Sequence, residues 1–468
     1  MPRSVAADAP QSRPRSALDE YAGVYEYLYR GVAYPAYESL RGRETFRYLR
    51  EYERSQWLSR DELQALQWAK LQRLLRHCQD HVPYYRDLWA KSGIHWSDLR
   101  DMEDYARLPE LRKEDIRQNY AALVAVPYQG RTMRKTTGGS TGQPLAFEYT
   151  RESYERRMAV AMRGYGWAGA RQGMRTAYLW GGDIVPPGRL QRMKTALHLA
   201  AVRRKMLNSF FLTRENIAAY VDSLNRFRPE VVVGYAGPLH HLARHCIDHG
   251  IALWKPRTVV TGSEALQEFQ REAIQQAFGA PVFNTYGCRE FMLMASECAA
   301  RDGLHVNMDH LVLEIADAPS PSGAGRVLVT DLHNFGMPFL RYANGDMASP
   351  MAGDCTCGRH LPRLAKVEGR VIDMIRTRDG RTVPGVFFPH LMKDVPGVDR
   401  FQVVQKRHDH IVIKIVPLEN FDASATAMLE GEVRKVLGTD TRVEYLLVDD
   451  IPLTASGKQR VTISELQP

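Results

Sequence analysis

The densest group of residues that could bind a phosphate is Thr136–Pro144, which reads Thr-Thr-Gly-Gly-Ser-Thr-Gly-Gln-Pro. Glycine leaves backbone N–H groups open to an anion, and serine and threonine hydroxyls add further hydrogen-bond donors. The segment lacks the Gly-Lys-Ser/Thr ending of a P-loop NTPase, which disfavours that family. Taken alone, the segment could also be a connecting loop rich in glycine and serine.

A second group has metal-binding chemistry and consists of three cysteines and one histidine, Cys298, His305, Cys355 and Cys357. Three thiolates and one imidazole would complete a closed tetrahedral zinc site. Four protein ligands leave no open position for catalysis, so the expected zinc is structural. The spacings match no standard zinc finger, and two unrelated groups of thiols are the alternative. His310 or His360 could replace one of the named ligands.

Four more segments with charged residues follow the glycine-rich loop, at Tyr286–Glu290 (Tyr-Gly-Cys-Arg-Glu), Asp331–Asp346, Gly369–Asp373 (Gly-Arg-Val-Ile-Asp) and Pro452–Lys458. In this order the five segments resemble the motifs of the adenylate-forming superfamily, which includes acyl-CoA ligases and peptide-synthetase adenylation domains. The sequences of His81–Trp89 and of Thr330–Tyr342 resemble those of the phenylacetate–CoA ligase-like and CapK-like branch of this superfamily. The motifs span residues 136 to 458 of 468.

The resemblance implies ATP-dependent activation of a carboxylic acid as its acyl-AMP. Such a reaction brings two anions together at the α-phosphate and expels pyrophosphate, so the site must neutralise charge and align the reacting oxygens. It implies catalytic roles for Glu290, as a ligand of Mg²⁺, for Arg370, and for Lys458, which would bind the carboxylate and α-phosphate. Asp346 would bind the ribose hydroxyls, and Asp373 would be the hinge.

By the same resemblance, further residues have expected binding roles. Those for ATP are Thr137, Gly138, Gly139, Ser140, Thr141, Gly142, Ser263, Glu264, Asn284, Thr285, Tyr286, Asp346 and Arg370. Those for the acyl substrate are Tyr235, Ala236, Gly237, Phe283, Gly287 and Cys288. Taken one at a time, the same residue types are also common as surface carboxylates, turn aspartates, core tyrosines and solvated lysines.

The elements that must position these residues alternate between strands and helices from about residue 132. β-Branched runs such as Val231–Val233 and Thr258–Thr261 alternate with helical stretches such as Leu239–His249, which is typical of an α/β fold with a partly parallel sheet. We expect a disordered tail over 1–18, a large N-terminal adenylation domain of mixed sheets and helices over 19–371, and a small mobile C-terminal α+β domain over 372–468.

The composition limits the function classes. The net charge is +9, but no basic array interleaved with aromatic residues suggests nucleic-acid binding. No signal peptide and no membrane span is evident, and six cysteines do not suggest a disulfide framework in 468 residues, so a cytoplasmic protein is expected. The basic run Arg189–Lys205 could be an amphipathic helix that meets a membrane or a partner, although a solvated helix face is the usual case.

The expected reaction is therefore formation of an acyl-AMP, with an aromatic acid and coenzyme A as acceptor implied by the resemblance. The runner-up is a ligase that passes the acyl group to an amine or hydroxyl, as in natural-product or surface-polysaccharide biosynthesis. A non-catalytic binding protein is less compatible with Glu290, Asp346, Arg370 and Lys458. A zinc-dependent nucleic-acid module would need a basic helix or aromatic strand near the cysteines, whereas residues 309–323 between the two ligand pairs carry carboxylates and no Lys or Arg. A homodimer is expected only because relatives are often dimers.

Overall fold

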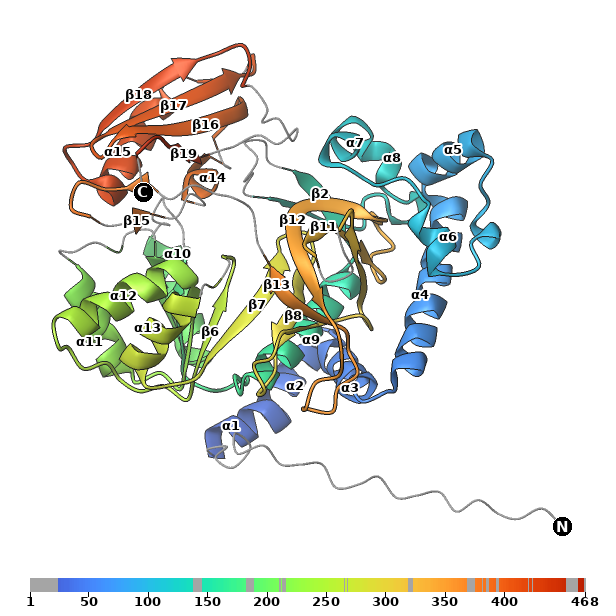
Figure 1. The fold of residues 1–468 in the computed structure, drawn as a ribbon, viewed down its shortest axis with the longest axis horizontal. Helices are drawn as coiled ribbons and strands as arrows, with labels where there is room; N and C mark the ends of the chain where they lie inside the picture. The colour runs from blue at the N-terminus through green and yellow to red at the C-terminus, as the bar shows by residue number, and fades with distance from the viewer. Residues whose placement is uncertain are drawn as a thin grey trace.

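The computed structural model describes residues 24–137, 145–181, 189–209, 212, 216–264, 266, 268–318, 323–367, 375–380, 382–383, 387–392, 395–419, 421–422, 424–451 and 462–466 (Figure 1). Its helical elements are α1 (Val24–Leu28), η2 (Tyr29–Ala33), α2 (Tyr34–Leu40), α3 (Thr45–Ser55), α4 (Arg60–His81), α5 (Pro83–Ser92), η3 (Trp96–Asp98), α6 (Met102–Ala106), α7 (Lys113–Gln118), α8 (Tyr120–Leu123), η4 (Val126–Tyr128), α9 (Arg151–Trp167), α10 (Arg189–Ala201), α11 (Ile217–Phe227), α12 (Ala236–Asp248), α13 (Glu268–Phe278), α14 (Phe387–Met392) and α15 (Ala425–Leu437).

The strands form one large sheet and three smaller ones. They are β1 (Met133–Thr136), β2 (Ala146–Tyr149), β3 (Thr176–Trp180), β4 (Arg204–Asn208), β5 (Val231–Tyr235), β6 (Thr258–Gly262), β7 (Val282–Cys288), β8 (Met292–Glu297), β9 (Leu304–Val306), β10 (Leu311–Ala316), β11 (Gly325–Asp331), β12 (Tyr342–Met351), β13 (Arg363–Val367), β14 (Ile375–Arg376), β15 (Thr382–Val383), β16 (Val398–Arg407), β17 (His410–Pro417), β18 (Arg442–Leu447) and β19 (Thr462–Ser464).

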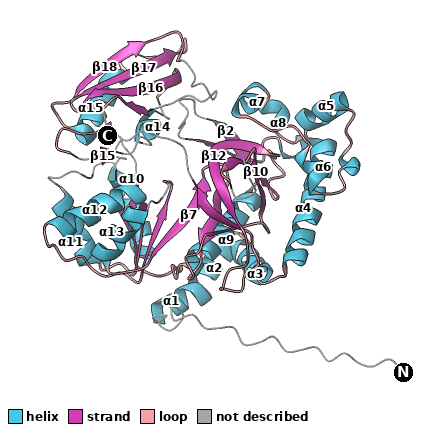
Figure 2. Cartoon of the chain, in the orientation of Figure 1, coloured by secondary structure: helices cyan, strands magenta, loops and turns pink. Residues whose placement is uncertain are grey.

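The large sheet has 11 strands in the order β10-β11-β12-β13-β9-β8-β7-β6-β5-β3-β4. The strands β4, β3, β5, β6 and β7 pair in parallel, and the pairs from β7–β8 to β10–β11 are antiparallel. Every residue of β5 and β6 is buried, as expected for parallel strands covered on both faces. Figure 2 shows α11, α12 and α13 grouped beside these strands. The predicted α/β class is confirmed.

The N-terminal helices pack on the antiparallel part of the sheet. Helix α4 begins with a capping box formed by Ser59 and Glu62, and it ends just before Pro83, where α5 begins. Its leucines Leu63, Leu71, Leu74 and Leu75 are buried and follow the spacing of one helix face. None of the described helices is long and apolar enough to cross a membrane.

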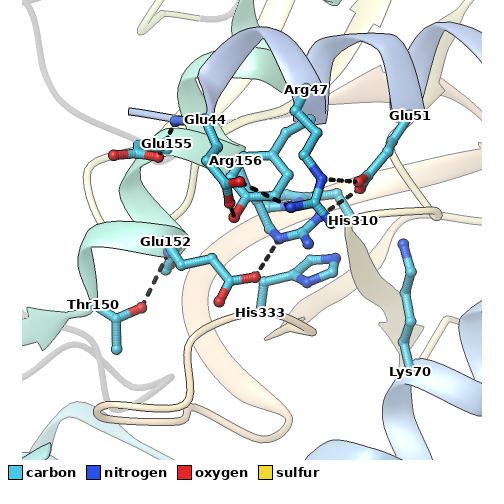
Figure 3. Close-up of polar contacts among 12 residues, drawn as sticks. Glu44, Arg47, Glu51, Lys70, Thr150, Glu152, Glu155, Arg156, His310 and His333 are labelled. Atoms are coloured by element: carbon cyan, nitrogen blue, oxygen red, sulfur yellow. Dashed lines mark hydrogen bonds and ion pairs between the residues drawn. The ribbon is translucent and has the colours of Figure 1, made fainter. Parts of the chain in front are cut away.

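A polar layer joins α3 to α9, and Figure 3 shows its centre. The guanidinium of Arg156 pairs with Glu152 at 2.9 Å and with Glu51 at 3.1 Å. Beneath it, the rings of His310 and His333 stack with centroids 5.4 Å apart. Burial lowers the pKa of His310 to about 4, so its neutral ring can hydrogen-bond the Tyr52 hydroxyl through Nδ1 at 2.9 Å. Helix α3, which precedes α4, is therefore held to the large domain by these polar contacts.

A smaller unit follows the large sheet. Its four strands have the order β18-β17-β16-β19, in which β16 and β17 form an antiparallel hairpin and β18 and β19 add in parallel. Helix α15 packs on this sheet through Leu429, Val433 and Val436. The predicted compact α+β module is thus present after β13, although the predicted boundary at residue 372 and the tail over 1–18 lie outside the described residues.

Candidate functional site

The predicted nucleotide residues gather where the parallel strands end. Strands β5 and β6 run side by side and end at Tyr235 and Gly262, which are partners in the register. A Cβ atom at Gly262 would lie 2.8 Å from the Thr285 hydroxyl oxygen, so the close approach of β6 to β7 requires glycine there. Ligands of α/β folds bind at such carboxyl ends of strands.

The polar centre of the site is a buried triangle of Tyr286, Asn344 and Asp346. The Tyr286 hydroxyl donates to Asp346 Oδ2 at 2.9 Å, and Asn344 Nδ2 donates to the same carboxylate oxygen at 2.9 Å. Asn344 Nδ2 also donates to the Tyr286 hydroxyl at 2.9 Å, and the side-chain oxygen Oδ1 of Asn344 accepts from the Asp346 N–H. The geometry therefore holds the Asp346 carboxylate in one orientation against β7.

The same face of β12 positions Glu290. Tyr342, Asn344 and Asp346 occupy alternate positions of β12, with one residue between each pair, so their side chains lie on one face of the strand. The Tyr342 hydroxyl donates to Glu290 Oε1 at 3.0 Å, and Glu290 is buried. A Cβ atom at Gly287 would lie 2.0 Å from the Met292 carbonyl oxygen, so the turn that carries Glu290 depends on glycine.

The structure describes only the base of the predicted phosphate loop. The N–H of Thr137 donates to the Leu145 carbonyl, and the Thr137 hydroxyl oxygen accepts from the Leu145 N–H, both at 2.9 Å. These two bonds close the hairpin of β1 and β2 beneath the loop. The remaining loop positions, Gly138, Gly139, Ser140, Thr141 and Gly142, lie outside the described residues, as do Arg370, Asp373 and Lys458.

The predicted pair Ser263 and Glu264 follows β6. Ser263 is exposed and has a φ of 66°, a left-handed conformation that is costly for serine. Glu264 Oε2 accepts a 2.7 Å hydrogen bond from the N–H of Gly237, while Oε1 is buried with no partner among the described residues. Burial raises the pKa of Glu264 to about 7. The Glu264 carboxylate thus joins the end of β6, where ATP binding is predicted, to Gly237, which is predicted to bind the acyl substrate.

The predicted acyl-binding residues occupy two environments. Tyr235 and Ala236 are buried where β5 meets α12, and the Tyr235 ring lies 4.4 Å from the Trp180 ring. Tyr235 also belongs to the apolar cluster that contains Ile375, Phe387 and other C-terminal side chains. Phe283, in contrast, packs among aliphatic side chains beneath the sheet, and Cys288 is half-buried against the main core.

Asn284 and Thr285 are fixed by their neighbours on β7. The N–H of Asn284 donates to Glu297 Oε2 at 2.7 Å, and Glu297 is itself paired with Arg271 at 2.7 Å. The Thr285 hydroxyl donates to the Thr261 carbonyl at 2.7 Å. These contacts set the position of the strand end from which Tyr286 projects.

The four predicted metal ligands meet at one point. All of their ligand atoms lie within 4.8 Å of one another. Cys298 Sγ and Cys355 Sγ are 3.6 Å apart, and Cys357 Sγ is 3.4 Å from His305 Nε2. The other ring nitrogen, His305 Nδ1, lies 3.4 Å from the Leu361 carbonyl. Neither His310 nor His360 is a member of this cluster.

Three residues of the site were not predicted. Tyr342 and Asn344 belong to the segment that ends at Asp346, and the two-residue spacing of Tyr-x-Asn-x-Asp would have placed all three on one strand face. No pattern in the sequence singled out Trp180, which ends β3.

Comparison with known proteins agrees with the motifs. Residues 375–465 match the family model of the CapK C-terminal domain. A phenylacetate–coenzyme A ligase of Thermus thermophilus is 29% identical over 440 residues, which cover 86% of this chain and 96% of that protein. Protein CapK of Staphylococcus aureus is 25% identical over 420 residues, covering 87% and 90% respectively.

Solved structures show the same fold. A 2-hydroxyisobutyryl-CoA ligase in complex with 2-HIB-AMP and CoA has a TM-score of 0.59 and 21% identity, covering 87% of this chain and 91% of that protein. The chain thus has the fold of the adenylate-forming CoA ligases. Its homologues are the phenylacetate–CoA ligases and CapK, so the branch indicated by the motifs is confirmed.

Proposed function

We propose that the protein is an ATP-dependent ligase that converts a carboxylic acid to its acyl-AMP, releases pyrophosphate and then transfers the acyl group to coenzyme A. The observation that carries the proposal is the triangle of Tyr286, Asn344 and Asp346, which lies beside Glu290 in a chain whose homologues are named acid–CoA ligases. It agrees with the order of five sequence motifs. The proposed function rests on the geometry of this site and on the order of the motifs together.

In the proposed reaction each described residue has a limited task. The Asp346 carboxylate accepts hydrogen bonds from the ribose hydroxyls, and Asn344 and Tyr286 hold it in position. Glu290 offers the oxygen ligand that Mg²⁺ prefers, and Mg²⁺ bound there would neutralise charge on the phosphates. Lys458 and Arg370 are proposed to contact the carboxylate and phosphate, as the motifs imply.

An aromatic acid is the proposed substrate, because Tyr235, which is predicted to bind the acyl group, lies against the ring of Trp180 at the end of β5. Transfer to an amine or hydroxyl remains the second candidate, supported by the match to the CapK C-terminal domain. We propose cytoplasmic action, since none of the described cysteines forms a disulfide bond.

We further propose that Cys298, His305, Cys355 and Cys357 hold a structural zinc ion. In a tetrahedral site with Zn–S of about 2.3 Å and Zn–N of about 2.0 Å, neighbouring sulfurs lie about 3.8 Å apart and a sulfur and nitrogen about 3.5 Å apart. The separations of 3.6 Å and 3.4 Å fit that geometry. The ion would join the loop after β8 to the segment between β12 and β13.

The acceptor is tested by product analysis. Purified protein is incubated with ATP, Mg²⁺ and a panel of aromatic and aliphatic acids, with and without coenzyme A, and the products are identified by mass spectrometry. The proposal predicts an acyl-AMP without coenzyme A and an acyl-CoA with it. An acyl-AMP that persists in the presence of coenzyme A, but disappears when amines or alcohols are added, would instead support the second candidate.

A further inference from the structure

Helix α10 exposes most of its described side chains to solvent. Among its residues whose side chains the structure describes, only Leu199 is half-buried, and the others are exposed. The helix connects β3 to the edge strand β4, which pairs in parallel with β3. A crossover helix normally buries its apolar face on the sheet that it crosses, which α10 does not do.

The apolar face of α10 points away from the protein. Leu190, Met193 and Leu197 are 62%, 57% and 66% exposed. At about 100° per residue they fall within an arc of roughly 60°, and Leu199, which faces the protein, lies on the opposite side of the helix. The outward arc is therefore continuous along the helix, and water covers it in the isolated chain.

The segment around α10 carries only positive charge. Between Asp183 and Glu215 the sequence has no acidic residue, and its cations are Arg189, Arg192, Lys194, Arg203, Arg204, Lys205 and Arg214. Arg203 and Arg204 contact Tyr25 and Tyr178 and so support the fold. On the helix itself Lys194 and His198 are exposed beside the apolar arc. The charge of Lys194 can meet an anionic surface, because no carboxylate of the segment competes for it.

We propose that α10 docks the protein on an anionic lipid surface, with Leu190, Met193 and Leu197 entering the interface and Lys194 facing the lipid phosphates. A helix with an apolar arc and cationic borders lies in the plane of such an interface. Cations near an anionic surface add to this attraction. A lipid surface accepts a protruding helix without a preformed groove, whereas a protein partner must supply one. The lipid surface is therefore favoured over an acidic protein.

The test is co-sedimentation of the full chain with vesicles. The probes are phosphatidylcholine vesicles with and without phosphatidylserine, at low and at high salt. The variant is the triple substitution Leu190→Gln, Met193→Gln and Leu197→Gln, which keeps good helix formers. The matched control is Leu418→Gln, Met428→Gln and Leu447→Gln, which removes side chains that are 51%, 52% and 59% exposed on the C-terminal unit. Circular dichroism and the unfolding temperature show that each variant folds.

Wild-type protein should bind the vesicles that contain phosphatidylserine, and binding should weaken as salt rises. The α10 variant should lose binding by at least about tenfold, while the control variant retains it. Absence of wild-type binding would overturn the proposal. So would equal loss in both variants, or unchanged binding of the α10 variant, because either result would assign adsorption to the overall charge. If wild-type protein instead forms a dimer that the α10 variant cannot form, a second copy covers the helix.

Discussion

At the scale of single residues, Asp346 is held by two donors that compete with any ligand for the same oxygen. Both Tyr286 and Asn344 donate to Oδ2, and these two bonds fix the carboxylate that we propose accepts from the ribose hydroxyls. Burial, and next the neighbouring Asp346 charge, raise the pKa of Tyr286 well above its usual value, so its hydroxyl stays a donor. The orientation of the carboxylate is therefore set before ATP binds.

Replacing Asp346 should weaken ATP binding more than acid binding. Asp346→Ala should raise the KM for ATP by about tenfold or more, because two charge-assisted hydrogen bonds to the ribose are lost. The KM for the acid should change much less. Steady-state kinetics with each substrate varied in turn measure both values. A larger change for the acid than for ATP would mean that the ribose assignment is wrong.

At the scale of elements, the Cys/His cluster joins segments that are distant in the sequence. Cys298 follows β8 and His305 lies on β9, while Cys355 and Cys357 lie between β12 and β13. Strand β13 pairs with β9 over only Arg363–His305 and Leu364–Leu304. Ligation of one ion by all four side chains would hold this short pairing together, and β12 carries Asp346.

Metal analysis tests this element directly. Purified protein should contain about one zinc ion per chain, and Cys355→Ser should lower the content and the unfolding temperature. Cys246→Ser is the matched control, since Cys246 is also buried but lies outside the cluster. Stable protein that is free of metal would contradict the zinc proposal.

A buried ion pair joins α9 to the segment before β10. Arg163 Nη2 donates to Asp309 Oδ1 at 2.8 Å, and both side chains are essentially unexposed. Burial alone would raise the pKa of Asp309, but the charge and hydrogen bonds of Arg163 lower it below the usual value. A lowered native pKa stabilises the fold above the unfolded pKa of about 4, and this stabilisation is lost as pH falls through the native pKa.

Asp309→Asn should therefore lower the free energy of unfolding at neutral pH by about 3–5 kcal/mol, because Arg163 stays buried without its counter-ion. The difference from wild type should shrink as pH falls through the native pKa. Urea unfolding over a pH series measures both effects. The control Asp248→Asn removes an exposed partner of Arg244 and should cost at most about 1 kcal/mol. Equal effects of the two substitutions would contradict the assigned role of the buried pair.

How much of these elements could be predicted depends on whether the signal is local. The buried runs of β5 and β6 and the helix α12 follow from apolar pattern, and Cys298 and Cys355 could be grouped by ligand chemistry alone. The triangle around Asp346 depends on the pairing of strands distant in the sequence, which no local pattern specifies. Helix α10 lies in the basic run Arg189–Lys205, for which the sequence predicted either an amphipathic docking helix or a solvated helix face, but the exposure of its apolar side chains required the structure.

At the scale of the whole molecule, the large unit and the C-terminal unit meet near the predicted acyl segment. Tyr235 at the end of β5 packs with Ile375, Phe387 and Phe388 of the C-terminal part. The C-terminal segment also carries Lys458 in its sequence, so the proposed reaction needs both units. The motif order predicted this division, whereas the contact of Tyr235 with the second unit required the structure.

Replacement of Lys458 tests this dependence. Lys458→Ala should reduce acyl-AMP formation by about a hundredfold or more, as loss of a charge-stabilising group does, while acyl transfer from preformed acyl-AMP changes much less. Lys406→Ala is the control, since Lys406 lies on the same unit and pairs at the surface with Glu465. Near-normal acyl-AMP formation by the Lys458 variant would remove this lysine from the mechanism.

The central claim is that the protein activates a carboxylic acid with ATP, and its most direct test is carboxylate-dependent ATP–pyrophosphate exchange. The assay uses folded, zinc-replete protein with Mg²⁺ and a panel of aromatic and aliphatic acids. We predict exchange that depends on one class of acid, with aromatic acids the most active. Absence of exchange with every acid would contradict the claim and would favour a binding protein built on an adenylate-forming fold.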